Sequence, residues 1–394
     1  MSERLEQIRA LGIGVDAIAL RRRLHQNPEL SEREFGTMEL ICGELERLGI
    51  PYEKRIAGTG VVGLLRGAQD GPTVGLRADM DALPIQEENP ELPYASRVPG
   101  VMHACGHDAH TAILLGTARM LSAMRERLHG SVKLLFQPAE ETIGGAARMI
   151  AAGCLENPHV DCVLGLHVDS GLLTGQIGVK NGKMYAASDM LDLRVFGKSC
   201  HGAHPDEGVD AILIAAAILN NLQSVVSRNV AATDAAVCTF GTIHGGNVLN
   251  QVADRVELTG ILRTLDQNTR LYVRDRVRTI AEQTAAMLGG RAELAMQESY
   301  GPLINTDAVV DVVRAACRSL LGEENVVELP APSMGVEDFS YFAAARPACF
   351  FHLGCRPSLE SPRLVAHSCQ FDVDDGCIPI GIAIQVENVL RLLK

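Results

Sequence analysis

The chain has 394 residues, of which 47% are hydrophobic and 21% are charged, so it is too apolar to be disordered and long enough for two or three domains. It carries 36 basic and 48 acidic residues, and the net charge of −12 argues against nucleic acid or an anionic membrane as a partner. The eleven cysteines, an odd number, and the lack of an apolar stretch in residues 1–6 predict a cytoplasmic protein with reduced thiols. The longest evident apolar run, residues 211–219, is too short to cross a membrane.

Helical and strand-like segments alternate along the first part of the chain. Helical periodicity is found at residues 15–24, 34–48, 109–128 and 146–152, and strand-like runs are found at 61–65, 74–77, 132–136 and 160–166. This alternation predicts an α/β fold with a mixed, largely parallel sheet covered by helices.

The strand-like runs at 61–65 and 74–77 flank a turn-forming segment and predict a hairpin. The spacing Gly58-x-Gly60-x-x-Gly63 lies at this place and fits a dinucleotide-binding loop. Such a loop requires a helix that opens at the glycines, whereas the sequence here continues as a strand. We therefore do not expect dinucleotide binding.

The middle of the chain has a different pattern. Its segments are a strand at 188–196, a helix at 209–226, strands at 235–243 and 256–262, a helix at 269–288 and a strand at 292–297. The order β-α-β-β-α-β is typical of a ferredoxin-like α+β domain. Afterwards the α/β pattern returns, with helices at 307–321, 337–344 and 374–393 and a strand at 348–353. We predict a discontinuous domain, residues 1–184 and 299–394, with a second domain inserted at 185–298.

The densest group of chemically versatile side chains is the segment His103-Ala-Cys105-Gly-His107-Asp108-Ala-His110. Thiolate and imidazole suit zinc, and also manganese, cobalt or nickel when carboxylates join them. A helix N-terminus rich in capping residues is the alternative interpretation. Three histidines, a cysteine and an aspartate within eight residues favour a metal site.

Further candidates stand at the ends of predicted strands or in loops: Asp79-Met-Asp81, Glu140-Glu141, His167 and His367. Each alone has an ordinary interpretation, such as a turn, a solvated pair at a helix start or a hydrogen-bonded histidine. Because the carboxyl ends of parallel strands meet at one edge of a sheet, we expect most of these groups to converge. A cysteine, several histidines and two carboxylate pairs form the set that a two-metal hydrolase requires.

The chain also resembles a known family over essentially its whole length. The motifs are Arg22-Arg-Leu-His25, Leu76-Arg-Ala-Asp-Met-Asp-Ala-Leu-Pro84, Met102-His-Ala-Cys-Gly-His-Asp-Ala-His-Thr111, Gln137-Pro-Ala-Glu-Glu141, Gly241-Thr-Ile-His-Gly-Gly246, Glu337-Asp-Phe339 and His367-Ser368. They resemble those of the amidohydrolase branch of the aminoacylase/carboxypeptidase metallohydrolases. That branch includes hippurate hydrolases, indole-acetyl-amino-acid hydrolases and N-acyl-amino-acid deacylases.

The resemblance implies two divalent metal ions per subunit, of zinc, manganese, cobalt or nickel. It assigns five metal ligands: Cys105, His107, Glu141, His167 and His367. It also implies that Glu140 is the general acid and base. Asp81 matches an aspartate that orients a metal ligand, and Asp79 replaces a histidine of the wider family, so contact between Asp79 and metal stays open.

The inserted domain would, by the same resemblance, be a lid and dimerisation domain. His201 matches a lid histidine that polarises the scissile carbonyl, and Asn250 and Arg263 match groups that hold the carboxylate of the substrate. A surface turn for His201 and a surface ion pair for Arg263 are the alternatives. The sequence departs from the family pattern around the expected substrate pocket, as at Cys200 and His204, which leaves the substrate preference open.

We therefore expect a metal-dependent amidohydrolase that cleaves small N-acyl amino acids into a carboxylic acid and a free amino acid. A homodimer or homotetramer is expected, with neither nucleic acid nor membrane as a partner. The alternatives are a related dipeptidase, an N-acetyldiaminopimelate deacetylase and, more remotely, a non-catalytic binding protein on the same fold.

Overall fold

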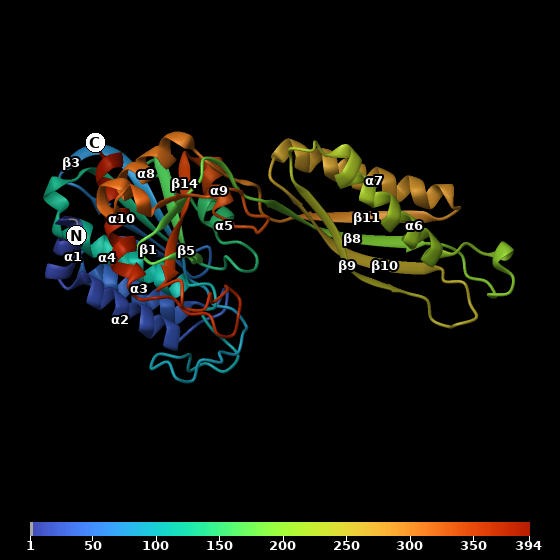
Figure 1. Cartoon of the computed structure of the whole chain (residues 1–394), viewed down its shortest axis with the longest axis horizontal. Coiled ribbons are helices and arrows are strands. Elements are labelled where there is room, and N and C mark those ends of the chain that lie inside the picture. The colour runs from blue at the N-terminus through green and yellow to red at the C-terminus, as the bar shows by residue number, and fades with distance from the viewer. Residues whose placement is uncertain (1–2) are drawn as a thin grey trace. The chain divides into compact units, whose positions relative to one another are not determined.

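The computed structural model describes residues 3–394, so the first two residues of the segment 1–6, in which no apolar stretch was found, lie outside the described part. The chain divides into two compact units. The first contains Met1–Gly182, Ile304–Ala331 and Asp338–Lys394, and the second contains Lys183–Leu303 and Pro332–Glu337. Figure 1 shows the chain coloured along its length, with the green-to-yellow middle forming a sheet of its own.

The first unit is built on an eight-stranded sheet. In spatial order its strands are β1 (Tyr52–Ile56), β2 (Gly60–Arg66), β4 (His129–Gln137), β3 (Gln69–Asp79), β5 (Cys162–Leu173), β14 (Ala348–Arg356), β6 (Ile177–Val179) and β13 (Val326–Glu328). The neighbours β4, β3, β5 and β14 run parallel, whereas β1, β2 and β6 join by antiparallel pairings. The sheet is therefore mixed and largely parallel at its centre.

The predicted hairpin of residues 61–65 and 74–77 is wrong. Strand β4 lies between β2 and β3, pairing antiparallel with β2 and parallel with β3. β2 instead forms an antiparallel hairpin with β1, a strand that was not predicted. β4 is buried along almost its whole length, as expected for an inner strand covered on both faces. An inner position in the sheet is the one that buries its apolar side chains. As expected, no helix opens at Gly60, which begins β2.

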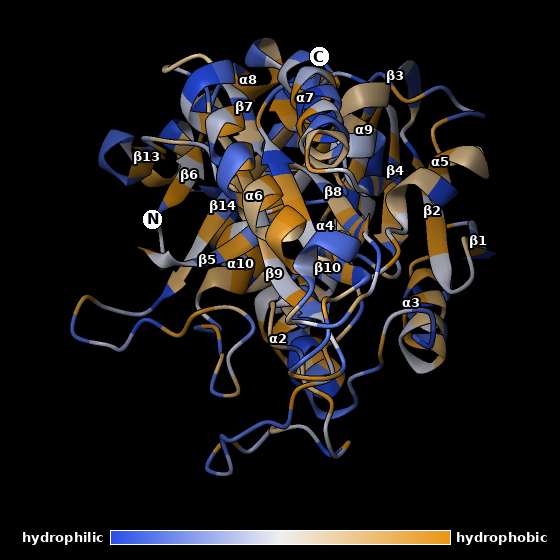
Figure 2. Ribbon diagram, turned by 90° about the vertical axis from the view of Figure 1, so that its right-hand side faces the viewer, coloured by the Kyte–Doolittle hydropathy of each residue, from blue (hydrophilic) through white to orange (hydrophobic). Residues whose placement is uncertain are grey.

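Helices cover this sheet. They are α1 (Glu3–Ala10), α2 (Ile13–Gln26), α3 (Phe35–Arg47), α4 (His107–Ala123), α5 (Ala146–Ala151), α8 (Asp307–Leu321), α9 (Ser340–Ala345) and α10 (Cys377–Leu392). α4 is almost completely buried, because it packs on β3 and is covered by α2 and α10. Figure 2 shows the hydrophobic residues in orange, many of them in strands such as β2.

The second unit has the order β-α-β-β-α-β. Its elements are β8 (Ala187–Phe196), α6 (Ala211–Ser224), β9 (Ala236–Gly245), β10 (Arg255–Thr264), α7 (Gln267–Met287) and β11 (Arg291–Glu298). The strands form an antiparallel sheet in the order β11-β8-β10-β9, and both helices pack on one face of it (Figure 1). Two short strands, β7 (Gly182–Tyr185) and β12 (Leu303–Asn305), pair where the chain enters and leaves this unit.

The second unit also contains a segment far away in sequence, Pro332–Glu337. It is held by backbone hydrogen bonds, from Ser333 N to Met184 O at 2.9 Å and from Ala186 N to Gly335 O at 3.0 Å. The predicted boundaries assigned these six residues to the discontinuous domain of residues 1–184 and 299–394. Their pairing with residues about 150 positions earlier leaves no local pattern in the sequence from which it could be predicted.

One helical stretch, Ala211–Asn229, is long and apolar enough by composition to cross a membrane. It joins α6 to a π-helical turn, Val225–Asn229. Its buried residues, which include Ile214, Ile218 and Leu222, belong to the hydrophobic core of the second unit. About a third of the stretch is buried in this way, and a single apolar helix of this length is weak evidence for a membrane span.

Candidate metal centre

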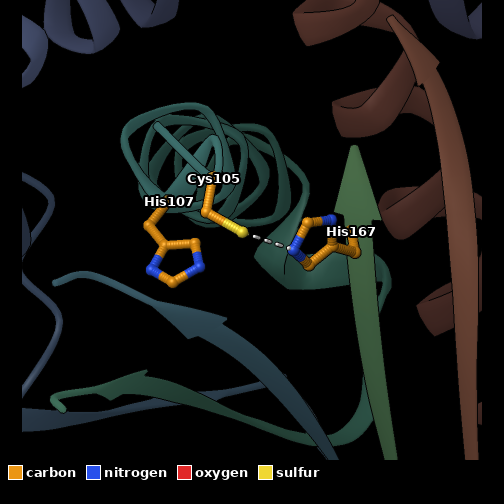
Figure 3. A group of neighbouring side chains, drawn as sticks. All are labelled: Cys105, His107 and His167. Carbon is orange, nitrogen blue, oxygen red and sulfur yellow. Dashed lines mark hydrogen bonds between the residues drawn. The ribbon is translucent and has the colours of Figure 1, made fainter. Parts of the chain in front are cut away.

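Three side chains of the predicted metal set, Cys105, His107 and His167, come together beside the central strands. Each offers one ligand atom within 4.8 Å of the other two. Cys105 Sγ lies 3.4 Å from His167 Nε2 (Figure 3). The backbone just before α4 is left-handed at Gly106, with φ of 88°, which turns His107 into the site without the cost that a side chain would bring. His167 lies inside β5 rather than after it, because that strand runs on to Leu173.

Hydrogen bonds determine which ring nitrogen of each histidine faces this group. His167 Nδ1 lies 2.7 Å from the carbonyl oxygen of Val168, to which it can only donate, so Nε2 is left toward Cys105. His107 Nδ1 lies 3.2 Å from Asp81 Oδ1, and Nε2 is buried without a hydrogen-bond partner among residues 3–394. A histidine held on one nitrogen by a carbonyl or carboxylate, with the other nitrogen available, is the usual arrangement of a metal ligand.

A second ligand group contains Cys105 again, together with Glu141 and His367. Glu141 Oε1 is buried and lies 3.1 Å from His367 Nε2, with which it pairs, and 3.9 Å from His107 Nε2. The two groups therefore share the Cys105 thiol. A buried imidazole nitrogen without a partner and a buried carboxylate oxygen, both beside a shared sulfur, form a donor set that suits a pair of metal ions.

Glu140 lies next to these groups, because it can place a carboxylate oxygen within 4.8 Å of ligand atoms of His107 and Glu141. Its side chain is buried, at 8% exposure. The loop that carries both glutamates is tied to Asp81, whose Oδ2 accepts hydrogen bonds from Glu141 N at 3.1 Å and from Ser31 Oγ at 2.7 Å. Asp81 therefore orients His107 with one oxygen and holds the glutamate loop with the other.

Asp79 stands behind His107. Its Oδ1 lies 2.6 Å from His110 Nδ1, its Oδ2 accepts from Arg77 at 2.6 Å, and its nearer oxygen is 3.8 Å from His107 Nε2. Arg77 is fully buried and also donates to Gln137 and Asp338. Both oxygens of Asp79 are thus engaged by other side chains, which favours a supporting position over direct contact with metal.

The charges around the site favour a cation at its centre. Burial alone would raise the pKa of Asp79, but Arg77 and the nearby histidines hold it well below its usual range. Burial and the neighbouring His110 hold the pKa of His167 well below its usual range, so its ring is neutral and able to ligate. Burial raises the pKa of the Cys105 thiol to about 12 in the protein without metal.

The three predicted residues of the inserted segment lie in the second unit. His201 is exposed, and its Nδ1 accepts from Ala203 N at 3.0 Å. Asn250 is its neighbour in space, because His201 pairs with Gln251 in an isolated β-bridge and Asn250 O accepts from Gly202 N. Arg263 is half-buried on β10, and its NH1 atom has no hydrogen-bond partner among the described residues.

Several supporting residues had no role in the sequence analysis. Arg77, His110 and Ser31 lie inside recognised motifs or close to them, yet each acts through partners elsewhere in the chain. For Arg77 these partners range from Asp79, two positions away, to Asp338, 261 positions away. Asp79 and Asp81, two positions apart at the end of a predicted strand, were the local signal for this cluster. Asp108, in the segment where helix capping was the alternative interpretation, accepts from Arg21 and contacts His25.

Comparison with known proteins is consistent with this geometry. A model of the peptidase family M20/M25/M40 matches residues 75–391. The chain belongs to this family. It is 38% identical over 380 residues to "IAA-amino acid hydrolase ILR1-like 4" of Arabidopsis thaliana, covering 95% of the chain and 85% of the relative. It is 41% identical over 376 residues to "N-acetyl-L-cysteine deacetylase" of Bacillus subtilis (strain 168), covering 95% and 88%.

A solved structure from the family is similar over nearly the whole chain. The YXEP protein of Bacillus subtilis, described as a dinuclear metal binding peptidase of family M20, aligns with a TM-score of 0.85 at 33% identity, covering 97% of this chain and 99% of the other. The predicted family and fold class are confirmed. As a member of this peptidase family, the chain is a hydrolase of amide bonds.

Proposed function

We propose that this M20 family member is a metal-dependent amidohydrolase that cleaves N-acyl amino acids into a carboxylic acid and a free amino acid. The observation that carries the proposal is the Cys105 thiol, which is shared by two ligand groups. His107 Nε2 in one group is buried without a hydrogen-bond partner among the described residues, and Glu141 Oε1 in the other is buried beside His367 Nε2 at 3.1 Å. We assign the ligands of two divalent ions to these groups: Cys105, His107, Glu141, His167 and His367. Thiolate, imidazole and carboxylate together suit zinc, manganese, cobalt or nickel.

Glu140 is the residue to which we assign the proton transfers. Divalent metals supply Lewis acidity to such a site and bring the pKa of a water toward about 7. Glu140 takes the proton of the attacking water and then delivers it to the nitrogen of the leaving amino acid. Its buried carboxylate lies on the same loop as a metal ligand, Glu141, and this supports its place at the reacting atoms.

The second unit would supply the remaining groups as a lid and dimerisation domain. We assign His201 to the developing negative charge of the scissile carbonyl, whether from the same subunit or from a second one. Arg263 and Asn250 are assigned to the carboxylate of the amino acid. Arg263 suits this task because its NH1 atom is buried without a hydrogen-bond acceptor among residues 3–394, and burial lowers its pKa.

The names of the two relatives favour this substrate class. Both names, an IAA-amino acid hydrolase and an N-acetyl-L-cysteine deacetylase, describe cleavage of an acylated amino acid. The peptidase name of the similar structure keeps a dipeptidase as the second candidate, and an N-acetyldiaminopimelate deacetylase is the alternative that rests on the sequence alone. We further propose a homodimer or homotetramer acting in the cytoplasm.

The role of Glu140 can be tested against that of its neighbour. Glu140→Gln should keep the metal content of the wild type and lose nearly all turnover, whereas Glu141→Gln should lose metal as well. Metal analysis and initial rates on the same preparations separate the two. Hydrolysis by Glu140→Gln at the rate of the wild type would overturn the assignment.

The substrate class requires a panel. Metal-analysed protein should hydrolyse at least one N-acetyl, N-benzoyl or indole-acetyl amino acid faster than simple dipeptides or N-acetyldiaminopimelate. Faster cleavage of the dipeptides, or of N-acetyldiaminopimelate, would favour the corresponding alternative. No hydrolysis of any of these compounds, with metal bound, would favour a binding protein.

A further inference from the structure

Two backbone N–H groups on either side of Glu140 are each held by a buried carboxylate from elsewhere in the chain. Glu141 N donates to Asp81 Oδ2 at 3.1 Å, as described above. On the other side, Ala139 N donates to Glu34 Oε1 at 2.9 Å. Glu34 precedes α3 and is separated from Ala139 by 105 positions in sequence. The backbone is therefore held on both sides of Glu140, at Ala139 N and at Glu141 N.

The backbone held by these two hydrogen bonds is strained. Ala139 has φ of 55°, a left-handed conformation that costs an ordinary residue of the order of 1 kcal/mol. The turn is closed by a hydrogen bond from Gly144 N to Ala139 O at 3.0 Å. Such a conformation persists only where the surroundings hold it, and the bond from Ala139 N to Glu34 is one such constraint.

Burial of the Glu34 carboxylate costs free energy. Its side chain is completely buried, and no ion pair joins it to a cation in residues 3–394. Its other oxygen accepts from Thr59 Oγ1, at 2.6 Å. Burial raises the pKa of Glu34 above its usual range. A buried carboxylate with two hydrogen bonds and no counter-charge is expensive, so a purely stabilising role is a poor account of it.

Capping of α3 does not account for Glu34 either. Glu34 stands at the position before the helix, yet its side chain makes no capping hydrogen bond. That task belongs to Glu29, whose carboxylate accepts from Gly36 N at 2.9 Å and Thr37 N at 2.8 Å. The two glutamates lie five positions apart and both accept backbone N–H groups, but only Glu34 reaches the loop of Glu140.

We propose that Glu34 is a positioning residue for Glu140, acting through Ala139 to hold the general base in its reactive orientation. The inference rests on the proposed function, because it assumes that Glu140 moves the proton. Glu141 is held separately by Asp81, so the metal ligand stays in place when Glu34 is removed. The effect of Glu34 should therefore fall on turnover and not on metal content.

The experiment compares Glu34→Ala and Glu34→Gln with the control Glu29→Ala, measuring kcat, KM, metal content and Tm on the substrate that the panel identifies. Glu34→Ala should lower kcat by about a hundredfold, as small misplacements of catalytic groups do, with little change in KM or metal content. Glu34→Gln should restore kcat, because its amide oxygen can accept from Ala139 N while its NH₂ group donates to Thr59. Glu29→Ala should lower Tm and leave kcat unchanged.

Three results would overturn the inference: a kcat of Glu34→Ala like that of the wild type, a loss of metal from Glu34→Ala, or a loss of kcat in Glu29→Ala as large as in Glu34→Ala. The parallel measurement on Glu140→Gln separates the two levels of argument. If Glu140→Gln is inactive and Glu34→Ala is fully active, the inference fails and the proposed function stands. If Glu140→Gln is fully active, the proposed function itself fails.

Discussion

His110 and Asp79 form a close pair behind the metal centre, with 2.6 Å between His110 Nδ1 and Asp79 Oδ1. The other ring nitrogen of His110 accepts from Val168 N at 2.9 Å, so Nδ1 carries the proton that is donated to Asp79. The carbonyl oxygen of the same residue, Val168, accepts the hydrogen bond from His167 Nδ1. The two polar backbone groups of Val168 thus connect the Asp79–His110 pair to a candidate ligand.

This connection predicts the effect of His110→Ala on metal binding. Loss of the ring leaves Val168 N without its acceptor and frees the backbone beside His167, and such supporting contacts are worth about 10- to 100-fold in metal affinity. Titration of the metal-free variant with Zn²⁺ against a chromophoric chelator measures the change. His159→Ala, which alters an exposed histidine, is the control and should bind like the wild type. Equal affinity of His110→Ala and His159→Ala would refute the prediction.

The Cys105 thiol predicts how metal affinity depends on pH. Burial raises its pKa to about 12 without metal, so at neutral pH the thiol is protonated and metal binding must displace that proton. Affinity for Zn²⁺ should therefore rise with pH, and the Cys105 proton should account for about tenfold per pH unit. Cys105→Ala should bind more weakly and show a slope lower by about one proton, whereas Cys238→Ala in the second unit should keep the slope of the wild type. An unchanged slope in Cys105→Ala would exclude the thiolate as a ligand.

The candidate metal ligands could be nominated from sequence because most of them lie in short motifs at strand ends. Cys105 and His107 are two positions apart, Glu140 and Glu141 are adjacent, and parallel strands bring such segments to one edge. His167 also belonged to an apolar strand, although that strand is longer than predicted. The structure brings these side chains together by the topology that the alternation of helices and strands had predicted.

The supporting contacts could not be predicted in the same way. Glu34 reaches Ala139 over 105 positions, and Arg77 reaches Asp338 over 261, so no local pattern connects them. The misplaced hairpin has a similar cause, because a turn between two strands does not reveal a third strand, β4, that inserts between them. Long-range pairing depends on burial and register, which periodicity alone does not contain.

His25 predicts a loss of stability at alkaline pH. Burial would lower its pKa, but Asp108, 2.8 Å away, and Glu87 raise it to about 9. This value is above the 6.5 of an unfolded histidine, so the contribution is fully present below pH 6.5 and is lost as the pH rises through 9. The wild type should lose about 3 kcal/mol more than His25→Gln between these pH values, measured by urea unfolding. Parallel pH profiles of the two proteins would show that His25 is not charged in the fold.

The close approach of the backbone at Gly145 predicts that the loop of Glu140 tolerates no side chain there. A Cβ at this position would lie 1.9 Å from the carbonyl oxygen of Pro138, too close for any relaxed structure. Gly145→Ala should therefore shift the loop, lower kcat, and destabilise the protein by about 1–3 kcal/mol. Gly43→Ala is the matched control, since Gly43 lies within α3 and a Cβ added there would meet no described atom within 4 Å, and it should raise stability by about 0.5–1 kcal/mol through helix propensity alone. Thermal unfolding and kcat of both variants provide the test, and unchanged values for Gly145→Ala would mean that the loop moves freely and does not hold Glu140 by packing.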